Sequence, residues 1–172
     1  LGSQCKDTKN KSMAEKKNAI SYESIMKDLK ARKFAPVYVL MGDEPFYIDK
    51  ICDYIAENVL QPEERDFNQT VLFGAGTTAV QVVDQCKGYP MMAEFRVVIV
   101  KEAQNLKSLD ALEKYLEKPV KSTILVICNK NGSIDRRKKF IPRAEQVGVV
   151  FESKKLYDRQ LPGFIETYLK AR

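Results

Sequence analysis

The sequence predicts an α/β domain whose core is a five-stranded parallel sheet covered by helices on both faces. Two observations lead to this prediction. Five short apolar runs, at 37–41, 68–73, 95–101, 122–129 and 148–153, alternate along the chain with segments whose apolar residues have helical spacing. Most of these runs are apolar throughout, as expected of parallel strands that are buried on both faces. Right-handed crossovers should join successive strands.

Five helical segments lie around the strands, at 22–29, 45–60, 78–87, 109–116 and 135–146. Ser21 is placed to cap the first segment and Ser108 the fourth, because a serine oxygen accepts hydrogen bonds from the free N–H groups of a first turn. Gly88 suits the end of the third. Pro142 should kink or divide the last segment, since proline lacks the N–H that a helix interior uses.

The composition excludes several classes of catalytic and metal site. The 172 residues include no histidine, which removes Ser-His-Asp and Cys-His triads as well as His-based metal sites. The four cysteines have no C-x-x-C spacing, and Cys52, Cys86 and Cys128 lie in apolar segments where reduced buried thiols are expected. We therefore expect neither a metal nor a cofactor.

Charge and hydropathy indicate a well-solvated protein with a real core. Hydrophobic residues make up 44% of the chain and charged residues 30%. The net charge of +6 arises partly from lysines near the start of the chain, and it permits nucleic-acid contact without requiring it. No apolar run approaches the ~18 residues of a membrane span, and the polar start does not resemble a secretory signal. A cytoplasmic protein without membrane contact is expected.

The chain is expected to have three parts. Residues 1–20 are predicted to be an added or flexible leader, and 21–156 the α/β domain. Residues 157–172 are predicted to form a hinge and the first helix of a truncated second, helical domain. Pro162 suits the start of that helix.

The stretch VYVLMGDEPFYIDK has the layout of a nucleotide-binding strand, turn and helix, but it lacks the residues that bind phosphate. The pattern G-x-x-x-x-G-K-[ST], begun at Gly42, needs Gly, Lys and Ser or Thr at 47–49, where the chain has Tyr-Ile-Asp. Asp43 and Glu44 would repel a triphosphate from the turn, and the proline after them removes one N–H donor. Their simpler role is to cap the helix that follows.

The metal-binding half of such a nucleotide site is altered as well. An apolar strand ending in Asp-Glu would hold magnesium, but the best-matching strand ends VVIVKEA and puts Lys101 at the position of the metal-binding carboxylate. Glu102 is expected to be an ordinary surface acid. Gly42, Asp43, Glu44 and Lys101 thus define a degenerate nucleotide site, and we expect no ATP hydrolysis by this chain.

Four motifs, in order and with matching spacing, carry a resemblance to a known family. They are VYVLMGDEPFYIDK, YPMMAEFRVVIVKEAQNL, YLEKPVKSTILVI and LYDRQLPGFI. Together they resemble the N-terminal part of the delta subunit of bacterial DNA polymerase III, over about 34–169. The resemblance implies an AAA+-type (P-loop-like) fold whose ATP site is lost. It also implies continuation into a helical second domain and a collar-forming third domain.

The function that this resemblance implies is that of a non-catalytic clamp-loader subunit of the DNA polymerase III holoenzyme. Such a subunit binds the ring-shaped sliding clamp (the beta subunit) and opens one ring interface, so that the clamp can be loaded on primed DNA during replication. ATP hydrolysis is done by sister subunits. The implied partners are the clamp, the delta prime and tau/gamma subunits, and DNA within the assembled loader. An open ring would bind this surface better than a closed one, which shifts the equilibrium toward opening.

The clamp contact of this family is a short helix with two adjacent bulky apolar residues, and the matching positions are Met91 and Met92. Pro90 suits the start of such a helix. Neighbouring helical residues point about 100° apart, so the two methionines cannot easily both face the core. Methionine suits an irregular apolar pocket, although the pair is a softer anchor than the Leu-Phe of other members. Tyr89 and Phe95 are the expected neighbours in the contact.

Several alternatives stay open at this stage. Met91 and Met92 could pad the base of the third strand, and Phe95 could belong to the core. The basic run at Arg136, Arg137, Lys138 and Lys139 could contact DNA phosphate or form only a solvated helix face.

Two other functions are also open. A nucleotide-binding protein or phosphotransferase with an unusual loop would bind ATP, but the lost phosphate loop and Lys101 count against it. A standalone DNA-binding domain would bind DNA in a salt-sensitive way, but the modest net charge of +6 gives it little support.

Overall fold

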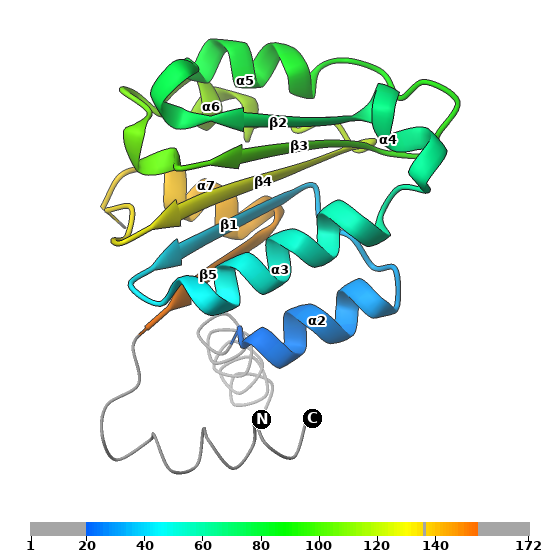
Figure 1. Cartoon of the computed structure of the whole chain (residues 1–172). Coiled ribbons are helices and arrows are strands. Elements are labelled where there is room, and N and C mark those ends of the chain that lie inside the picture. Colours follow the sequence, from blue (N-terminus) through cyan, green and yellow to red (C-terminus); the bar gives the residue numbers. More distant parts are fainter. Residues whose placement is uncertain (1–19, 136, 155–172) are drawn as a thin grey trace, which may run out of the picture.

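The computed structural model describes residues 20–135 and 137–154, and the strands in this part of the chain form one parallel sheet. The strand order is β2-β3-β4-β1-β5, and all neighbours are parallel (Figure 1). The strands are β1 (Val37–Gly42), β2 (Gln69–Phe73), β3 (Arg96–Lys101), β4 (Thr123–Lys130) and β5 (Val149–Ser153). The predicted five-stranded parallel sheet is confirmed. Apart from residue 20, the predicted leader and the predicted hinge lie outside the described residues.

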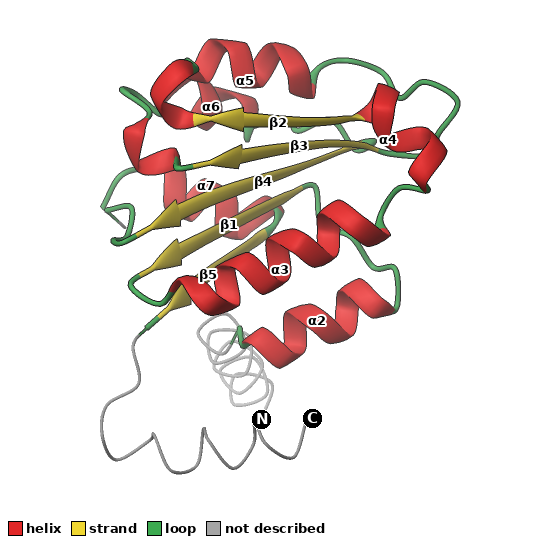
Figure 2. Ribbon diagram, viewed as in Figure 1, coloured by secondary structure: helices red, strands yellow, loops and turns green. Residues whose placement is uncertain are grey.

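Helices cover both faces of the sheet (Figure 2). One face carries α2 (Tyr22–Lys30) and α3 (Pro45–Asn58), and the other carries α5 (Ala79–Cys86), α6 (Asp110–Tyr115) and α7 (Phe140–Val147). In β1, Val37, Val39 and Met41 join the core beneath α5, α6 and α7. Tyr38 and Leu40 join the core beneath α2 and α3. Burial on both faces explains why this strand is apolar throughout.

The sequence pattern does not predict one of the helices, α4 (Pro62–Asn68). It begins at Pro62, two residues after the end of the predicted segment 45–60, and proline is favourable at a first helical position. The Glu64 carboxylate accepts a hydrogen bond of 3.3 Å from the Gln61 N–H. The sequence PEERDFN has no apolar stripe, so that hydrophobic periodicity cannot reveal this helix. α4 leads directly into the edge strand β2.

The last helix is shorter than the predicted segment 135–146, and Pro142 does not lie in its interior. α7 begins at Phe140, so Pro142 lies in its first turn, where N–H groups have no helical partner. Residues 137–139 form the turn before the helix. At the other end of the chain, Ser21 caps α2 as predicted, because its hydroxyl accepts a hydrogen bond of 3.2 Å from a first-turn N–H.

Candidate protein-interaction site

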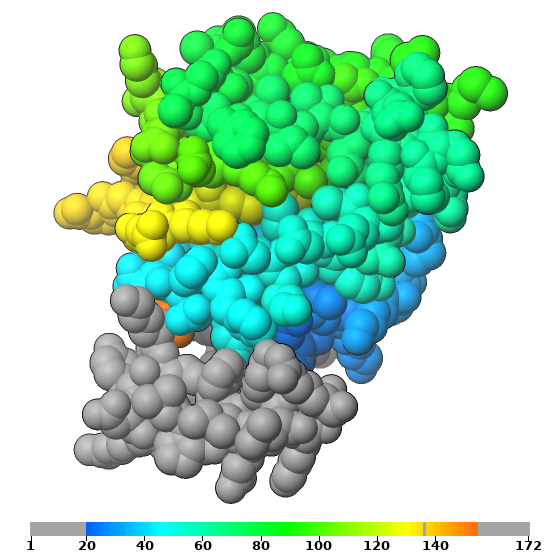
Figure 3. Space-filling view, viewed as in Figure 1, coloured from blue at the N-terminus to red at the C-terminus, as the bar shows by residue number. Residues whose placement is uncertain are grey.

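The segment that was expected to contact a clamp forms a loop between α5 and β3, which we call the 89–95 loop. A short helix was expected from Pro90, but residues 91–94 form bends. Met92 has a left-handed backbone conformation, with φ of 55°, which a right-handed helical turn does not allow. The prediction of a helix is therefore wrong here. The loop projects beside α4 at one end of the molecule, on the right in Figures 1 and 3.

The loop exposes three of the four predicted contact residues. Met92 is 101% exposed, Tyr89 83% and Met91 59%. Neither methionine pads the base of β3. Phe95 is half-buried against the core beneath α3, and its ring packs edge-on to Phe34 with 5.4 Å between the ring centroids. Phe95 thus fixes the end of the loop to the core.

The start of β3 is also fixed to the end of α5. The Arg96 guanidinium donates hydrogen bonds of 2.8 Å to the Gln85 backbone oxygen and of 2.8 Å to the Gln85 side-chain oxygen. The end of the 89–95 loop that enters β3 is therefore held by packed and hydrogen-bonded groups.

The middle of the loop is held by a side chain that sequence analysis missed. Asn68, the last residue of α4, is only 1% exposed. Its Oδ1 accepts a hydrogen bond of 2.6 Å from the Met91 N–H, and its Nδ2 donates to the Met91 carbonyl at 2.8 Å. The same Nδ2 donates to the Glu64 carbonyl at 3.0 Å. No local pattern could reveal this contact, because Asn68 and Met91 are 23 residues apart.

α4 adds an exposed aromatic side chain to this end of the molecule. Phe67 directly precedes Asn68 and is 65% exposed. Together with Tyr89, Met91 and Met92, it leaves the amino ends of β2 and β3 unusually rich in exposed apolar side chains. Sequence analysis missed Phe67 because α4 itself was not predicted.

The turn after β1, where a phosphate loop would lie, makes contacts within the chain. Gly42 and Gly132 exchange backbone hydrogen bonds of 2.9 and 3.4 Å. The Glu44 N–H donates to the Ser153 carbonyl at 3.3 Å. The Glu44 carboxylate accepts from the Phe46 N–H at 3.2 Å and so caps α3, as predicted. The polar backbone groups of this turn are thus largely used inside the protein.

Lysines end β4 and β3, the two strands that follow β1 on one side of the sheet. Lys130 at the end of β4 forms an ion pair of 2.6 Å with Asp49 of α3, and this contact raises the pKa of Lys130 above its usual value. Lys101 ends β3 and is exposed. Within residues 20–135 and 137–154, no three His, Cys, Asp or Glu side chains gather in a way that could hold a metal ion.

The described part of the basic run, residues 137–139, lies in the turn before α7 and not on a helix face. Arg136 is outside the described residues. Arg137 donates hydrogen bonds of 3.2 and 3.1 Å to the Asp135 carboxylate, and these lower the pKa of Asp135. Lys138 and Lys139 are exposed. The turn follows β4, so it lies at the carboxyl end of the sheet, whereas the 89–95 loop precedes β3 at the amino end.

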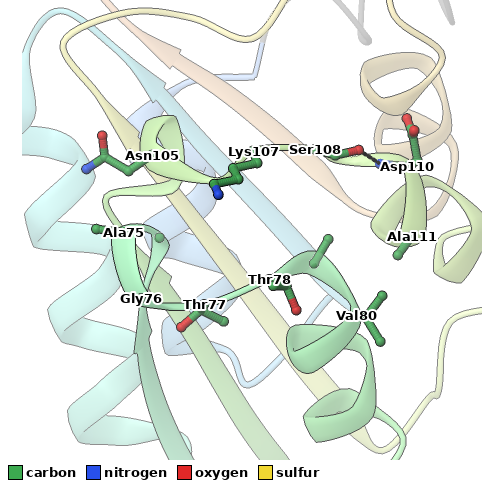
Figure 4. Close-up of a pocket in the computed structure, with 12 residues that line it drawn as sticks. Ala75, Gly76, Thr77, Thr78, Val80, Asn105, Lys107, Ser108, Asp110 and Ala111 are labelled. Atoms are coloured by element: carbon green, nitrogen blue, oxygen red, sulfur yellow. Dashed lines mark hydrogen bonds between the residues drawn. The ribbon is translucent and has the colours of Figure 1, made fainter.

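A hollow of about 510 Å³ lies between the loops that follow β2 and β3 (Figure 4). Thr77 and Thr78 line one side, and Lys107 and Ser108 the other. Hydroxyl groups on both sides cap helices: Thr78 exchanges hydrogen bonds with Gln81 at 2.9 and 3.2 Å, and Ser108, a predicted cap, accepts from the first N–H of α6 at 3.3 Å. The N-cap position of α6 is nevertheless one residue later than Ser108. Sequence analysis missed this hollow because its walls meet only in the folded sheet.

The described cysteines are buried thiols, as expected. Cys52, Cys86 and Cys128 are free, and burial raises the pKa of Cys86 to about 12. A hydrogen bond with Cys52, together with burial, raises the pKa of Cys128. None of the helices in the described part of the chain is both long and apolar enough to span a membrane.

Comparison with known proteins assigns the family. The model of the family described as DNA polymerase III, delta subunit, matches residues 38–154. The chain belongs to this family. A curated delta relative, DNA polymerase III subunit delta of Bacillus subtilis (strain 168), is 27% identical over 157 residues, which are 86% of this chain and 45% of the relative. The family expected from the four sequence motifs is confirmed.

A solved delta structure shows the same fold. The Bacillus subtilis DNA clamp loader delta protein (YqeN) matches with a TM-score of 0.76 and 25% identity, over 88% of this chain and 48% of that protein. The chain therefore spans about half the length of the delta relatives that it matches.

Proposed function

We propose that this chain binds a sliding clamp through the 89–95 loop and helps to hold one interface of the ring open during clamp loading. The exposure of Met91 and Met92 on a loop that is tied to the sheet supports this proposal. Tyr89 extends the same surface, whereas Phe95 supports the loop from within the core. The loop lies within residues 38–154, which match the family of DNA polymerase III delta subunits.

The proposed mechanism is differential binding. Met91 and Met92 are 59% and 101% exposed in the free chain, so burying both in an apolar pocket of the clamp would contribute about 3–5 kcal/mol. If the pocket accepts them better in an open ring than in a closed one, the difference in binding free energy shifts the ring toward opening. No covalent step is required.

We propose that the chain itself hydrolyses no ATP and that the sister subunits of the loader, delta prime and tau/gamma, are its other partners. The turn from Gly42 to Glu44 uses its backbone groups within the protein, and an exposed lysine ends β3. Few free backbone N–H groups therefore remain for a triphosphate to bind, and the lysine offers no ligand to its magnesium ion.

A weaker contact with DNA is proposed for the turn before α7. Asp135 partly neutralises Arg137, so Lys138 and Lys139 are the described cations that a phosphate would meet. Affinity of the assembled loader for DNA should then fall with added salt less steeply when both lysines are replaced by alanine.

Calorimetric titration of the chain with its cognate sliding clamp tests the main proposal. The test compares the unchanged chain with a Met91→Ala/Met92→Ala variant and with Phe73→Ala, a matched control that removes a 52% exposed apolar side chain from the far end of β2. The double variant should lose at least about 3 kcal/mol of binding free energy, or more than 100-fold in affinity, while the control binds normally. Equal binding by all three would place the contact elsewhere, and no binding by the unchanged chain would reject the proposal.

A further inference from the structure

We infer that Asn68 is a positioning residue for the clamp contact: its side-chain amide fixes the backbone of Met91 and so presents Met91 and Met92 outward. The inference rests on the proposed contact between the 89–95 loop and a clamp. It assigns a functional role to a residue of α4, which lies outside the loop itself.

The geometry of the amide is specific to Met91. One amide group both accepts from the Met91 N–H at 2.6 Å and donates to the Met91 carbonyl at 2.8 Å, as a neighbouring strand would. The second Nδ2 hydrogen reaches the Glu64 carbonyl at 3.0 Å. A flipped amide would place two donors together and an oxygen against two carbonyls, so the contacts define its orientation. The side chain is 1% exposed, so that water cannot replace these bonds without opening the loop.

The loop needs such a constraint because it has no regular structure of its own. Residues 91–94 form bends, and Met92 has a φ of 55°, which is unfavourable for a residue with a side chain. Phe95 and Arg96 hold only the end of the loop near β3. Without the Asn68 amide, the loop should sample several conformations. A clamp would then bind only the competent fraction, and its apparent affinity would fall by that fraction.

The Asn68→Ala variant separates positioning from a general effect on the fold. Asn129→Ala is the matched control, because Asn129 is also buried, at 6% exposure, and donates one hydrogen bond of 2.9 Å to the Gly132 carbonyl at the opposite end of the sheet. The hydrogen-exchange rate of the Met91 backbone amide measures how often the loop opens in the free protein. Stopped-flow mixing measures the rate at which the chain associates with the clamp. If Asn68→Ala does not fold, Asn68→Ser replaces it, since the short hydroxyl cannot make the paired contact with Met91 and places no charge against the Met91 and Glu64 carbonyls.

We expect Asn68→Ala to accelerate exchange of the Met91 amide at least tenfold and to weaken clamp affinity about tenfold, mainly through slower association. In the Met91→Ala/Met92→Ala background the same change should cost no further affinity, and Asn129→Ala should leave both readouts unchanged. Unchanged Met91 exchange, unchanged affinity, or an equal loss of affinity in the Met91→Ala/Met92→Ala background would overturn the inference. If the unchanged chain binds no clamp, the proposed function fails, and the Met91 exchange rate alone still decides whether Asn68 holds the loop.

Discussion

Replacing Gly42 with alanine should destabilise the domain far more than the same change at two other glycines. Gly42 has a φ of 128°, and a Cβ there would lie 2.0 Å from the Ser153 carbonyl oxygen and 2.7 Å from its nitrogen. Real Cβ atoms essentially never come within 3.0 Å of a heavy atom outside their own residue and its two chain neighbours. The clash is with backbone, so β5 would have to shift by about 1 Å in a closely packed sheet.

The expected loss in the free energy of unfolding has two contributions. Holding a residue with a side chain at such a φ costs about 1–3 kcal/mol. The shift of β5 would also weaken the Glu44–Ser153 hydrogen bond of 3.3 Å and the Gly42–Gly132 pair, each worth about 1 kcal/mol. The total of about 3–5 kcal/mol is a large part of the 5–15 kcal/mol that is typical of a domain.

Urea unfolding of three alanine variants isolates the clash. Gly132 has a φ of 150°, but a Cβ added there would have no atom within 4 Å. The Gly132→Ala variant is therefore destabilised by backbone strain and not by a clash. Gly76 has neither a positive φ nor a close atom, and Gly76→Ala should be almost neutral. With an m-value of about 2 kcal/mol/M, Gly42→Ala should lower the unfolding midpoint by about 2 M. Equal midpoints for Gly42→Ala and Gly132→Ala would refute the reasoning.

Three further outcomes can be checked separately. Phe67→Ala should weaken clamp binding several-fold by calorimetry, by about 1 kcal/mol, since Phe67 is 65% exposed beside the 89–95 loop; unchanged binding would exclude it from the contact. Asp49→Asn should cost only about 0.5 kcal/mol in urea at pH 7, because the ion pair with Lys130 is largely exposed. The Lys130 pKa is raised, so this contribution is fully present below pH 10.5 and disappears as pH rises through the folded-state value; a loss that persists at higher pH would contradict it. Cys86, whose pKa burial raises to about 12, should react with iodoacetamide at pH 8 only after unfolding, and rapid labelling of the native protein, detected by mass spectrometry, would show that it is not buried.

The sequence predicts the sheet well because its signal is hydrophobic burial, which a strand such as 37–41 carries in its own residues. It fails where the deciding interaction is not local or not apolar. α4 is polar along its whole length, and Pro142 was placed in the interior of a helix because the start of α7 could not be located from periodicity.

The sequence likewise predicts some residues of the candidate site and misses others. Met91 and Met92 stand out in the sequence as adjacent apolar residues after a proline, and the structure exposes both. The expected helix is absent because Met92 takes a left-handed conformation that no propensity favours. Asn68 could not be found, because its role depends on a partner that only the folded sheet brings near.

The parallel direction of every strand has a consequence for how two partners could act together. The 89–95 loop and the turn before α7 lie at opposite ends of the sheet, and a six-residue strand such as β3 separates such ends by about 20 Å. Occupants of the two surfaces would not compete for space. The central strands between them are packed on both faces and are hard to deform, so that we expect the coupling free energy between a ring and a nucleic acid to be close to zero within this domain. Any cooperation between the two ligands would then have to arise between subunits, not inside this one.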